Sequence, residues 1–254
     1  GAGRMLDPDE IAAIVCGPLA AGEGALAGKT VLVTAGPTRE PIDPVRYITN
    51  RSSGKMGYAI ASAAASQGAR VILVSGPVSL REPAGVEVVH VNTAEEMYDA
   101  THESIGDADI FVGAAAVSDY RPSSAAGQKI KKSEETMQID LVRSKDILAS
   151  VAGLDAAPFT VGFAAETENV RDYAMGKLRN KKLDMIVANR VGDDCGFDTD
   201  DNLVEVYWNG GEQGFEKAAK TELAYDIMKL VGERYAATRG TDTQPSLKRL
   251  HAID

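Results

Sequence analysis

Residues 36–57 (GPTREPIDPVRYITNRSSGKMG) place polar side chains in one long loop that three prolines stiffen. Asn50, Ser52, Ser53 and Gly54 lie near the start of an expected helix, whose first backbone N–H groups have no intrahelical partner. Such N–H groups bind anions, so this segment could hold a phosphate group. Ser52 or Ser53 could instead simply cap the helix. The length of the loop favours function, because long ordered loops in compact domains are usually functional.

Two other patterns could contact an anionic ligand. Lys177 and Lys181 stand four residues apart on an expected helix, so they could meet two phosphates of a triphosphate from one face. The alternative is an ordinary solvated charge stripe. Gly113 and the three alanines after it lie at the end of an expected strand, where small residues let a ligand approach the backbone. Tight packing of the strand against a helix is the alternative there.

These residues must be positioned by alternating strands and helices. A strand over 30–34 precedes the polar loop, and a helix over 58–67, ended by Gly68, follows it. Thr93 with Glu96 is expected to cap the next helix. The other strands are expected at 70–75, 86–91, 110–113, 137–142, 159–164, 185–188 and 203–208, with a turn at 209–211. The other helices are expected at 94–104, 145–152 (capped by Ser144), 170–182 and 216–235.

This alternation predicts an α/β fold, a Rossmann-like three-layer sandwich whose central sheet is mostly parallel. An antiparallel extension is expected near the C-terminus. Ligands of open α/β sheets bind at the carboxyl ends of the strands. The polar loop is therefore expected at the ligand-binding edge of the sheet.

The composition limits the possible partners. At 254 residues with 44% hydrophobic content, the chain is long enough for one globular domain with a full core. A net charge of −10 argues against nucleic acid, which needs a basic face. Local basic clusters in an acidic chain suggest a small polyanion such as a nucleotide. They comprise Lys129, Lys131 and Lys132, and Lys177, Arg179, Lys181 and Lys182.

A cytoplasmic protein without a membrane partner is expected. No apolar stretch approaches the roughly 18 residues that span a bilayer, and the first residues lack a signal peptide pattern. Cys16 and Cys195 have no CxxC spacing and are expected to be reduced thiols. His90, His102 and His251 lack the spacing of zinc ligands.

Two common nucleotide motifs are incomplete. Residues 28–30 (GKT) resemble the end of a P-loop, but Glu23 stands where the loop needs its first glycine, and the segment precedes its strand. Tyr173 and Lys177 form a YxxxK pair as in short-chain dehydrogenases, but no GxGxxG follows the first strand. An NAD(P)-dependent reductase and a noncatalytic nucleotide-binding module remain as alternatives.

Four motifs in one order resemble the bacterial phosphopantothenate–cysteine ligase family. They are the loop at 36–57, AAAVSDYRP at 114–122, KIKKS at 129–133 and VGFAAET at 161–167, and together they cover about residues 28–235. The resemblance implies a CTP-dependent ligase of coenzyme A biosynthesis that joins 4′-phosphopantothenate to L-cysteine. The substrate carboxylate would attack CTP, giving an acyl-cytidylate and pyrophosphate, and the cysteine amine would then displace CMP.

The resemblance also implies which residues form the site. Asn50 and Lys129 would be catalytic: Asn50 would donate a hydrogen bond to the acyl oxygen during cysteine attack, and Lys129 would assist acyl-cytidylate formation. Asp119 would help to place Mg²⁺, or Mn²⁺, beside the triphosphate. Ser52, Ser53 and Gly54 would form the phosphate or substrate loop. The CTP-binding residues would be Gly113, Ala114, Ala115, Asp119, Lys129, Val142, Arg143, Ser144, Lys145, Phe159, Lys177 and Lys181.

The resemblance extends to the organisation of the chain. Residues 1–14 resemble the end of the decarboxylase domain that many bacteria fuse ahead of the ligase, so residues 1–27 are expected to be a remnant of that domain with a linker. Residues 28–236 would form the ligase domain, and 237–254 a disordered tail. The family is dimeric, so a homodimer is expected, with the flexible lysine-bearing segment 121–136 near the partner subunit.

Overall fold

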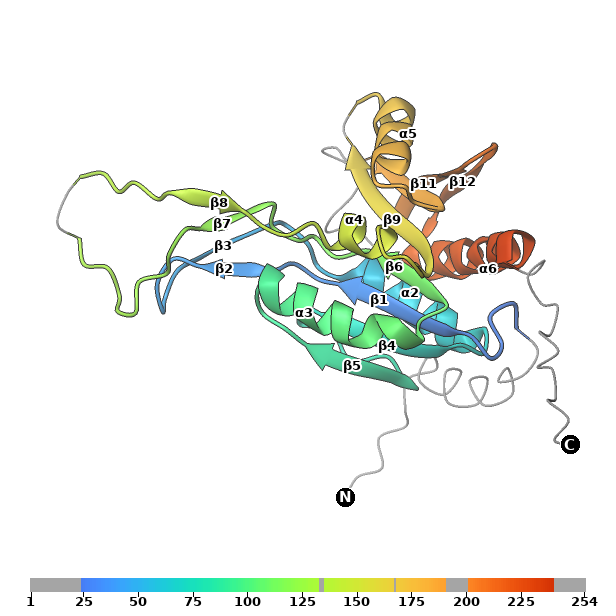
Figure 1. The fold of residues 1–254 in the computed structure, drawn as a ribbon, viewed down its shortest axis with the longest axis horizontal. Coiled ribbons are helices and arrows are strands. Elements are labelled where there is room, and N and C mark those ends of the chain that lie inside the picture. Colours follow the sequence, from blue (N-terminus) through green and yellow to red (C-terminus); the bar gives the residue numbers. More distant parts are fainter. Residues whose placement is uncertain (1–23, 133–134, 167, 191–200, 240–254) are drawn as a thin grey trace, which may run out of the picture.

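The computed structural model describes residues 24–132, 135–166, 168–190 and 201–239. Its largest sheet comprises β1 (Thr30–Ala35), β4 (Arg70–Ser75), β5 (Val86–His90), β6 (Ile110–Gly113), β9 (Phe159–Glu166), β10 (Met185–Arg190), β11 (Asp201–Trp208) and β12 (Gly211–Ala219). The strand order is β12-β11-β10-β9-β6-β1-β4-β5 (Figure 1). Neighbours from β5 to β10 pair in parallel, and β11 and β12 form an antiparallel extension. The predicted α/β fold is confirmed.

Helices cover both faces of this sheet because its central strands are apolar on both sides. In β1, Val31 and Val33 pack toward one face and Leu32 toward the other. The first face is covered by α2 (Lys55–Ser66) and α6 (Lys220–Arg239). The second is covered by α3 (Ala94–Ser104), which continues into η1 (Ile105–Asp107), and by α4 (Ile147–Ala152) and α5 (Val170–Asn180). Three layers result.

The strand order reverses beside β1. From β1 the chain builds β4 and β5 on one side, then crosses over to build β6, β9 and β10 on the other. The connections that leave β1 and β6 therefore diverge at the carboxyl ends of these strands, where Thr34 pairs with Gly113. Ligands of open α/β sheets bind in the crevice that such a reversal creates.

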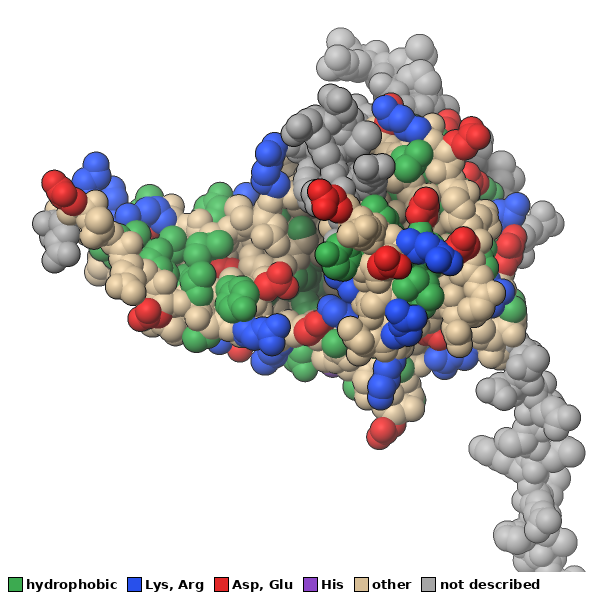
Figure 2. Space-filling model, turned by 90° about the horizontal axis from the view of Figure 1, so that it is seen from above, with side chains coloured by type: hydrophobic (Ala, Val, Ile, Leu, Met, Phe, Trp, Pro, Cys, Tyr) green, Lys and Arg blue, Asp and Glu red, His purple; other side chains and the backbone are tan. Residues whose placement is uncertain are grey.

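Two short ribbons project from this edge of the sheet (Figure 1). One pairs β2 (Arg39–Pro41) with β3 (Tyr47–Thr49), and the other pairs β7 (Tyr120–Pro122) with β8 (Leu141–Arg143). We call residues 38–49, 120–132 and 135–143 the arm. Hydrophobic side chains gather on its surface in Figure 2. Seven of the ten large hydrophobic side chains that are exposed among the described residues belong to it: Val45, Tyr47, Tyr120, Ile130, Met137, Leu141 and Val142.

Most sequence-predicted elements are present. The bounds of β4, α3 and β6 match the expected ranges, and Gly68 follows the end of α2 with a φ of 87°. The capping box of α3 is confirmed, because the Thr93 side chain accepts a hydrogen bond from the Glu96 N–H at 3.2 Å. Local signals were sufficient for these elements.

Three predictions about elements are wrong. The expected strand at 137–142 is reduced to β8, which pairs with β7 outside the main sheet. The expected helix at 216–235 begins only at Lys220, because the preceding nine residues pair with β11 as β12. Asp146, not Ser144, caps α4, and its side chain accepts a hydrogen bond from the Ala149 N–H at 3.0 Å.

The predicted domain limits also shift slightly. Leu26 lies within the expected linker but is fully buried in the core, and its N–H donates to the Gln67 carbonyl at 3.3 Å. At the other end, α6 runs on to Arg239 rather than ending before a tail at 237. Cys16, Cys195, His251 and the predictions for 1–23 and 240–254 lie outside the described residues.

Candidate functional site

Two adjoining cavities open at the carboxyl ends of β1 and β6. The first has a volume of about 470 Å³ and is lined mainly by the polar loop and the start of α2. The second has a volume of about 370 Å³ and is lined mainly by residues around the start of α4. Ala115, Val117, Asp119 and Phe163 line both, so the cavities share one wall. Their size suits a nucleotide and a second small substrate.

Most of the predicted site residues line these cavities. Asn50, Ser52, Ser53, Gly54, Ala114 and Lys177 line the first cavity. Gly113, Arg143, Ser144, Lys145 and Lys181 line the second. Ala115 and Asp119 lie on the shared wall. The structure thus brings together segments that are more than 100 residues apart in the chain.

The polar loop enters α2 through Gly54, whose φ is 77°. A Cβ atom at this position would lie 2.6 Å from Val78 Cγ1, so glycine is required for two reasons. Gly54, which has no side chain, occupies the N-cap position, so neither Ser52 nor Ser53 stands at that position. Residues 55–57, at the start of the helix, line the first cavity, and backbone N–H groups at a helix start suit an anion.

Asn50 holds the polar loop against the shared wall. The segment after β6 lies beside the end of β1, where the Ala114 N–H donates to the Thr34 carbonyl at 3.2 Å. Asn50 Nδ2 donates to the carbonyl oxygens of Ala116 at 3.3 Å and Val117 at 3.0 Å. Its donation to an acyl oxygen stays a prediction. For that donation, Asn50 Nδ2 would have to break its hydrogen bond to the carbonyl of Ala116 or of Val117.

Asp119 is the carboxylate at the centre of the site. It is exposed on the shared wall, and its backbone carbonyl accepts a hydrogen bond from the Ser144 N–H at 2.9 Å. In the part of the chain that the structure describes, no three His, Cys, Asp or Glu side chains cluster as a metal site. A cation beside Asp119 would therefore complete its coordination with substrate phosphates. Mg²⁺ is commonly bound in this way.

Lys181 and Lys177 line different cavities. Lys181 Nζ lies 2.7 Å from Asp146 Oδ2 in the second cavity. Burial opposes ionisation of Asp146, but the hydrogen bonds from Lys181 and the Ala149 N–H, with the positive charges of Lys181 and Arg143, outweigh it and lower the pKa of this carboxyl. Since Lys177 lines the first cavity, a nucleotide would have to span both cavities to meet both lysines.

Two buried hydroxyl groups line the second cavity without a hydrogen-bond partner among the described residues: Ser118 Oγ and Ser144 Oγ. Ser118 is 3% exposed, and its N–H donates to Thr38 Oγ1 at 3.0 Å. A buried polar group without a partner costs about 1–3 kcal/mol. These hydroxyls are therefore suited to meet polar atoms of a ligand.

Lys145 lies at the rim of the second cavity and is drawn toward α3. Its Nζ lies 3.8 Å from Glu95 Oε1, 4.0 Å from Asp99 Oδ1 and 4.4 Å from the centre of the Tyr98 ring. Lys145, Glu95 and Asp99 are all exposed, so the two ion pairs contribute little to stability. A ligand phosphate in the second cavity could therefore replace Glu95 and Asp99 as the partner of Lys145.

Three predicted CTP-binding residues line neither cavity. Phe159 is 1% exposed at the start of β9, where its ring packs edge-on against Tyr235 with centroids 6.0 Å apart. A ligand at the carboxyl ends of the strands cannot reach it. Val142 is 39% exposed on the arm, and Lys129 is also exposed there. These two residues are absent from the walls of both cavities within this single subunit.

The first cavity is also lined by three residues outside every motif, Asn189, Asn202 and Lys220, and by Phe163 and Ala165 of the VGFAAET motif. Phe163 also lines the second cavity, and it belongs to the VGFAAET motif four positions after Phe159. Phe163, rather than Phe159, is therefore the phenylalanine of this strand that lines both cavities. The sequence did not indicate Lys220 as a cavity residue, because the helix expected at 216–235 placed it within a helix and away from any strand end.

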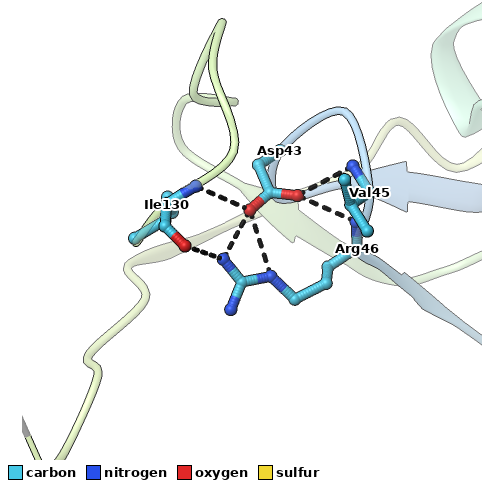
Figure 3. A network of polar contacts seen from close by, with 4 residues as sticks. All are labelled: Asp43, Val45, Arg46 and Ile130. Atoms are coloured by element: carbon cyan, nitrogen blue, oxygen red, sulfur yellow. Dashed lines mark hydrogen bonds and ion pairs between the residues drawn. The ribbon is translucent and has the colours of Figure 1, made fainter. Parts of the chain in front are cut away.

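A buried carboxylate joins the two halves of the arm (Figure 3). Asp43 is 3% exposed, and its Oδ1 accepts hydrogen bonds from the N–H groups of Val45 at 2.8 Å and Arg46 at 2.9 Å. Its Oδ2 accepts from Arg46 Nε at 3.0 Å and from the Ile130 N–H at 3.1 Å, and Arg46 Nη2 donates to the Ile130 carbonyl at 3.1 Å. We call Asp43, Arg46 and Ile130 the clamp.

The clamp fixes the chain directly beside Lys129. The Arg46 hydrogen bond outweighs the effect of burial and, with three backbone N–H groups, holds the pKa of Asp43 well below its ordinary value. Asp43 is therefore ionised at neutral pH. The expectation of a wholly flexible segment at 121–136 is thus wrong at Ile130, which is held by both partners.

The chain matches the DNA/pantothenate metabolism flavoprotein C-terminal domain family over residues 26–235. This range contains both cavities and the arm, and the chain belongs to this family. Among the described residues, no helix combines the length and apolar character that a membrane span requires.

The curated relatives include proteins named coenzyme A biosynthesis bifunctional protein CoaBC. The one from Vibrio vulnificus (strain CMCP6) is 49% identical over 235 residues, which cover 91% of this chain and 58% of the relative. The one from Escherichia coli (strain K12) is 46% identical over 240 residues, which cover 92% and 59%. The chain therefore spans less than two thirds of the length of these relatives.

Solved structures share the fold. The crystal structure of the C-terminal domain of a CoaBC protein has a TM-score of 0.72 and 42% sequence identity, covering 83% of this chain and 97% of that one. The DNA/pantothenate metabolism flavoprotein from Streptococcus pneumoniae has a TM-score of 0.69 at 22% identity, covering 81% and 99%. The described part of the chain thus corresponds to almost all of a CoaBC C-terminal domain.

Proposed function

We propose that this chain is a CTP-dependent ligase that joins 4′-phosphopantothenate to L-cysteine in coenzyme A biosynthesis. The observation that carries the proposal is the pair of cavities that meet at Asp119, because the reaction needs a nucleotide and a second anion side by side. The second cavity offers unpaired hydroxyls for a base or ribose, and the first offers lysines and the start of α2 for phosphates. Relatives named for coenzyme A biosynthesis support the same reaction.

The reaction proceeds in two displacements. The carboxylate oxygen of phosphopantothenate forms a bond to the α-phosphorus of CTP, and the bond to pyrophosphate breaks. The cysteine amine then forms a bond to the acyl carbon, CMP leaves with the electrons of the acyl–oxygen bond, and the amine loses a proton. No covalent bond to the protein is needed. The protein aligns two anions, which lowers the barrier by orientation and by neutralising charge.

The chain supplies this alignment from fixed positions. Lys177 and the start of α2 would hold phosphates in the first cavity, and Lys181 and Arg143 would hold the nucleotide in the second. Mg²⁺, bound through Asp119 and the phosphates, would further neutralise charge on the reacting phosphoryl group. Asn50 would donate to the acyl oxygen during attack by cysteine, after one backbone carbonyl releases its amide.

Lys129 would complete the site from a second copy of the chain. It lies on the arm and lines neither cavity of its own subunit, whereas the arm exposes seven large hydrophobic side chains. An apolar surface of this kind favours burial against a partner. We therefore propose a cytoplasmic homodimer, in which the arm of one subunit covers the crevice of the other.

The decisive test is turnover by the purified chain. With CTP, Mg²⁺, phosphopantothenate and cysteine, pyrophosphate and CMP should be released in equal amounts. Lys129→Ala should lose pyrophosphate release, whereas Lys132→Ala, in the same exposed segment, provides the matched control. Turnover with ATP equal to turnover with CTP would contradict the assignment to CTP, and absence of CMP would contradict the ligase function.

The geometry does not favour an NAD(P)-dependent reductase. Tyr173, the acid of the YxxxK pair, is 54% exposed and lines neither cavity. A proton donor there would act in bulk solvent rather than on a bound substrate. The YxxxK spacing is therefore a coincidence of helical periodicity.

A further inference from the structure

The residues that line the second cavity include an apolar group and a polar group. The apolar group surrounds Gly113, where an added Cβ atom would lie 3.2 Å from Leu148 Cδ1 and 3.6 Å from the nearest atom of the Phe111 ring. The polar group surrounds Asp119: Ser118 precedes it in the chain, and its backbone carbonyl accepts a hydrogen bond from the Ser144 N–H. The cavity therefore offers an apolar wall suited to a flat ring, and two hydroxyl groups beside a carboxylate.

Ser118 and Ser144 are held in place through their backbones, whereas their hydroxyls have no partner. The Ser118 N–H donates to Thr38 Oγ1 at 3.0 Å, and the Ser144 N–H donates to the Asp119 carbonyl at 2.9 Å. Both Oγ atoms are buried, and neither has a hydrogen-bond partner in the part of the chain that the structure describes. A hydroxyl can both donate and accept hydrogen bonds, so another hydroxyl is a suitable partner for it. A ribose carries two neighbouring hydroxyls.

The order of groups in a nucleotide decides which of them lies beside these serines. The ribose lies between the base and the α-phosphate. The apolar wall around Gly113 suits the base, and a metal ion bound by Asp119 would hold the phosphates. Ser118 and Ser144 adjoin Asp119 in the same cavity, so a nucleotide in this orientation places its ribose against the two serines.

We propose that the hydroxyls of Ser118 and Ser144 bind the 2′- and 3′-hydroxyls of the ribose, so that the chain selects ribonucleotides over deoxyribonucleotides. This inference rests on the ligase function proposed above and adds a specificity site to it. A deoxyribonucleotide would leave a buried serine hydroxyl unpaired after excluding water from the cavity, which weakens its binding. The two serines bind the nucleotide and take no part in either displacement.

The test compares the affinities of CTP, 2′-deoxy-CTP and 3′-deoxy-CTP, measured by calorimetry in the presence of Mg²⁺. The wild-type chain should bind CTP about 5- to 50-fold more tightly than either analogue. Ser118→Ala should abolish the discrimination against one analogue, and Ser144→Ala should abolish the discrimination against the other. The matched control is Ser62→Ala, at an exposed position of α2 that lines neither cavity, and it should keep both wild-type ratios.

The ratios distinguish the ribose from the rest of the nucleotide. A serine variant that binds CTP and both analogues more weakly by the same factor would show contact with the base or the phosphates, and would overturn the proposal. Equal affinity of the wild-type chain for all three nucleotides, or wild-type ratios in both alanine variants, would overturn it as well. Ser118→Cys, whose thiol has a similar shape but forms weaker hydrogen bonds, gives the same comparison if thermal melting shows that Ser118→Ala does not fold.

Failure of this inference can be told from failure of the ligase function. Discrimination between the nucleotides without release of CMP in the turnover assay would overturn the ligase function and leave the ribose site standing. Release of CMP with equal affinities for the three nucleotides would overturn the ribose site alone. A wild-type chain that does not bind CTP would overturn both.

Discussion

The central sheet and the arm are held together in different ways. The sheet buries apolar side chains on both faces, and Leu32, Val33 and Leu73 have no exposed surface. The arm is held mainly by hydrogen bonds and ion pairs, and the clamp is the most extensive of these networks. Isolated two-stranded ribbons are marginally stable in water, so the arm depends on such contacts.

This difference separates stability from chemistry. The sheet forms the crevice and supplies the free energy of folding, whereas the arm carries Lys129 and the exposed apolar surface. Substitutions in the sheet should therefore change unfolding more than turnover. Substitutions in the arm should change turnover more than unfolding.

The largest expected effect is on unfolding. Leu73→Ala, in the middle of β4, should lower the free energy of unfolding by about 2–5 kcal/mol, because it leaves a cavity in a closely packed core. Val45→Ala, at a position 59% exposed on the arm, should change it by less than about 0.5 kcal/mol. Urea unfolding measures both. Equal losses would show that the arm belongs to the same cooperative core.

The next effect is on turnover. Asp43→Asn should lower kcat about 10- to 100-fold if Lys129 has the catalytic role proposed above, because the clamp positions the chain beside Lys129 and a displaced catalytic group loses rate steeply. Glu82→Gln removes the charge of an exposed carboxylate that pairs with His90, and it should leave kcat unchanged. Pyrophosphate release would be followed for both. A normal kcat in Asp43→Asn would show that the clamp is purely structural.

The clamp should also respond to acid in a defined direction. The pKa of Asp43 is lower in the folded protein than its ordinary value of about 3.9. Its contribution to stability is therefore complete above about pH 4 and is lost as the pH falls through the folded pKa. Carboxyl carbon NMR should show Asp43 titrating below the ordinary pKa of an aspartate. Titration of Asp43 near pH 4 would contradict the clamp.

The smallest effect is expected at Ser118. Ser118→Ala removes a buried hydroxyl without a protein partner, so the free energy of unfolding should not fall, because relief of the cost of that unsatisfied group offsets the loss of a few packing contacts. Affinity for CTP should nevertheless fall, since the hydroxyl lines the second cavity. Thermal melting and calorimetry measure the two quantities. A loss of stability with unchanged CTP affinity would reverse this assignment.

The sequence predicted the sheet well because burial leaves a local pattern. Strands such as TVLVT are apolar on both faces, and the Thr93 capping box marks a helix start directly. The arm left no comparable pattern. Its strands are three residues long and pair across the chain, and β8 was placed within a longer strand at 137–142. Pairing of distant segments, rather than local propensity, decides such elements.

Predicted site residues line the cavities where motifs run through strand ends. Ala115 and Asp119 lie where the AAAVSDYRP motif indicated. Phe159 lines neither cavity, because a motif identifies a strand but not which of its residues reach the carboxyl end. Lys220 was missed because its position depends on β12, whose pairing with β11 replaced a helical preference. Asp43 was missed because its partner Ile130 lies 87 residues away.

The reversal of strand order beside β1 has a consequence for synthesis of the chain. Although β1 is made first, its neighbours in the sheet are β4 and β6, at 70–75 and 110–113. At a synthesis rate of about 5–20 residues per second, β1 is completed about 2–7 s before its first neighbour, β4, is synthesised. Gly36 and Pro37 end this strand at once, and proline prevents it from extending into an aggregating edge. The start of the loop that lines the crevice thus also limits aggregation of β1 while the chain is being synthesised.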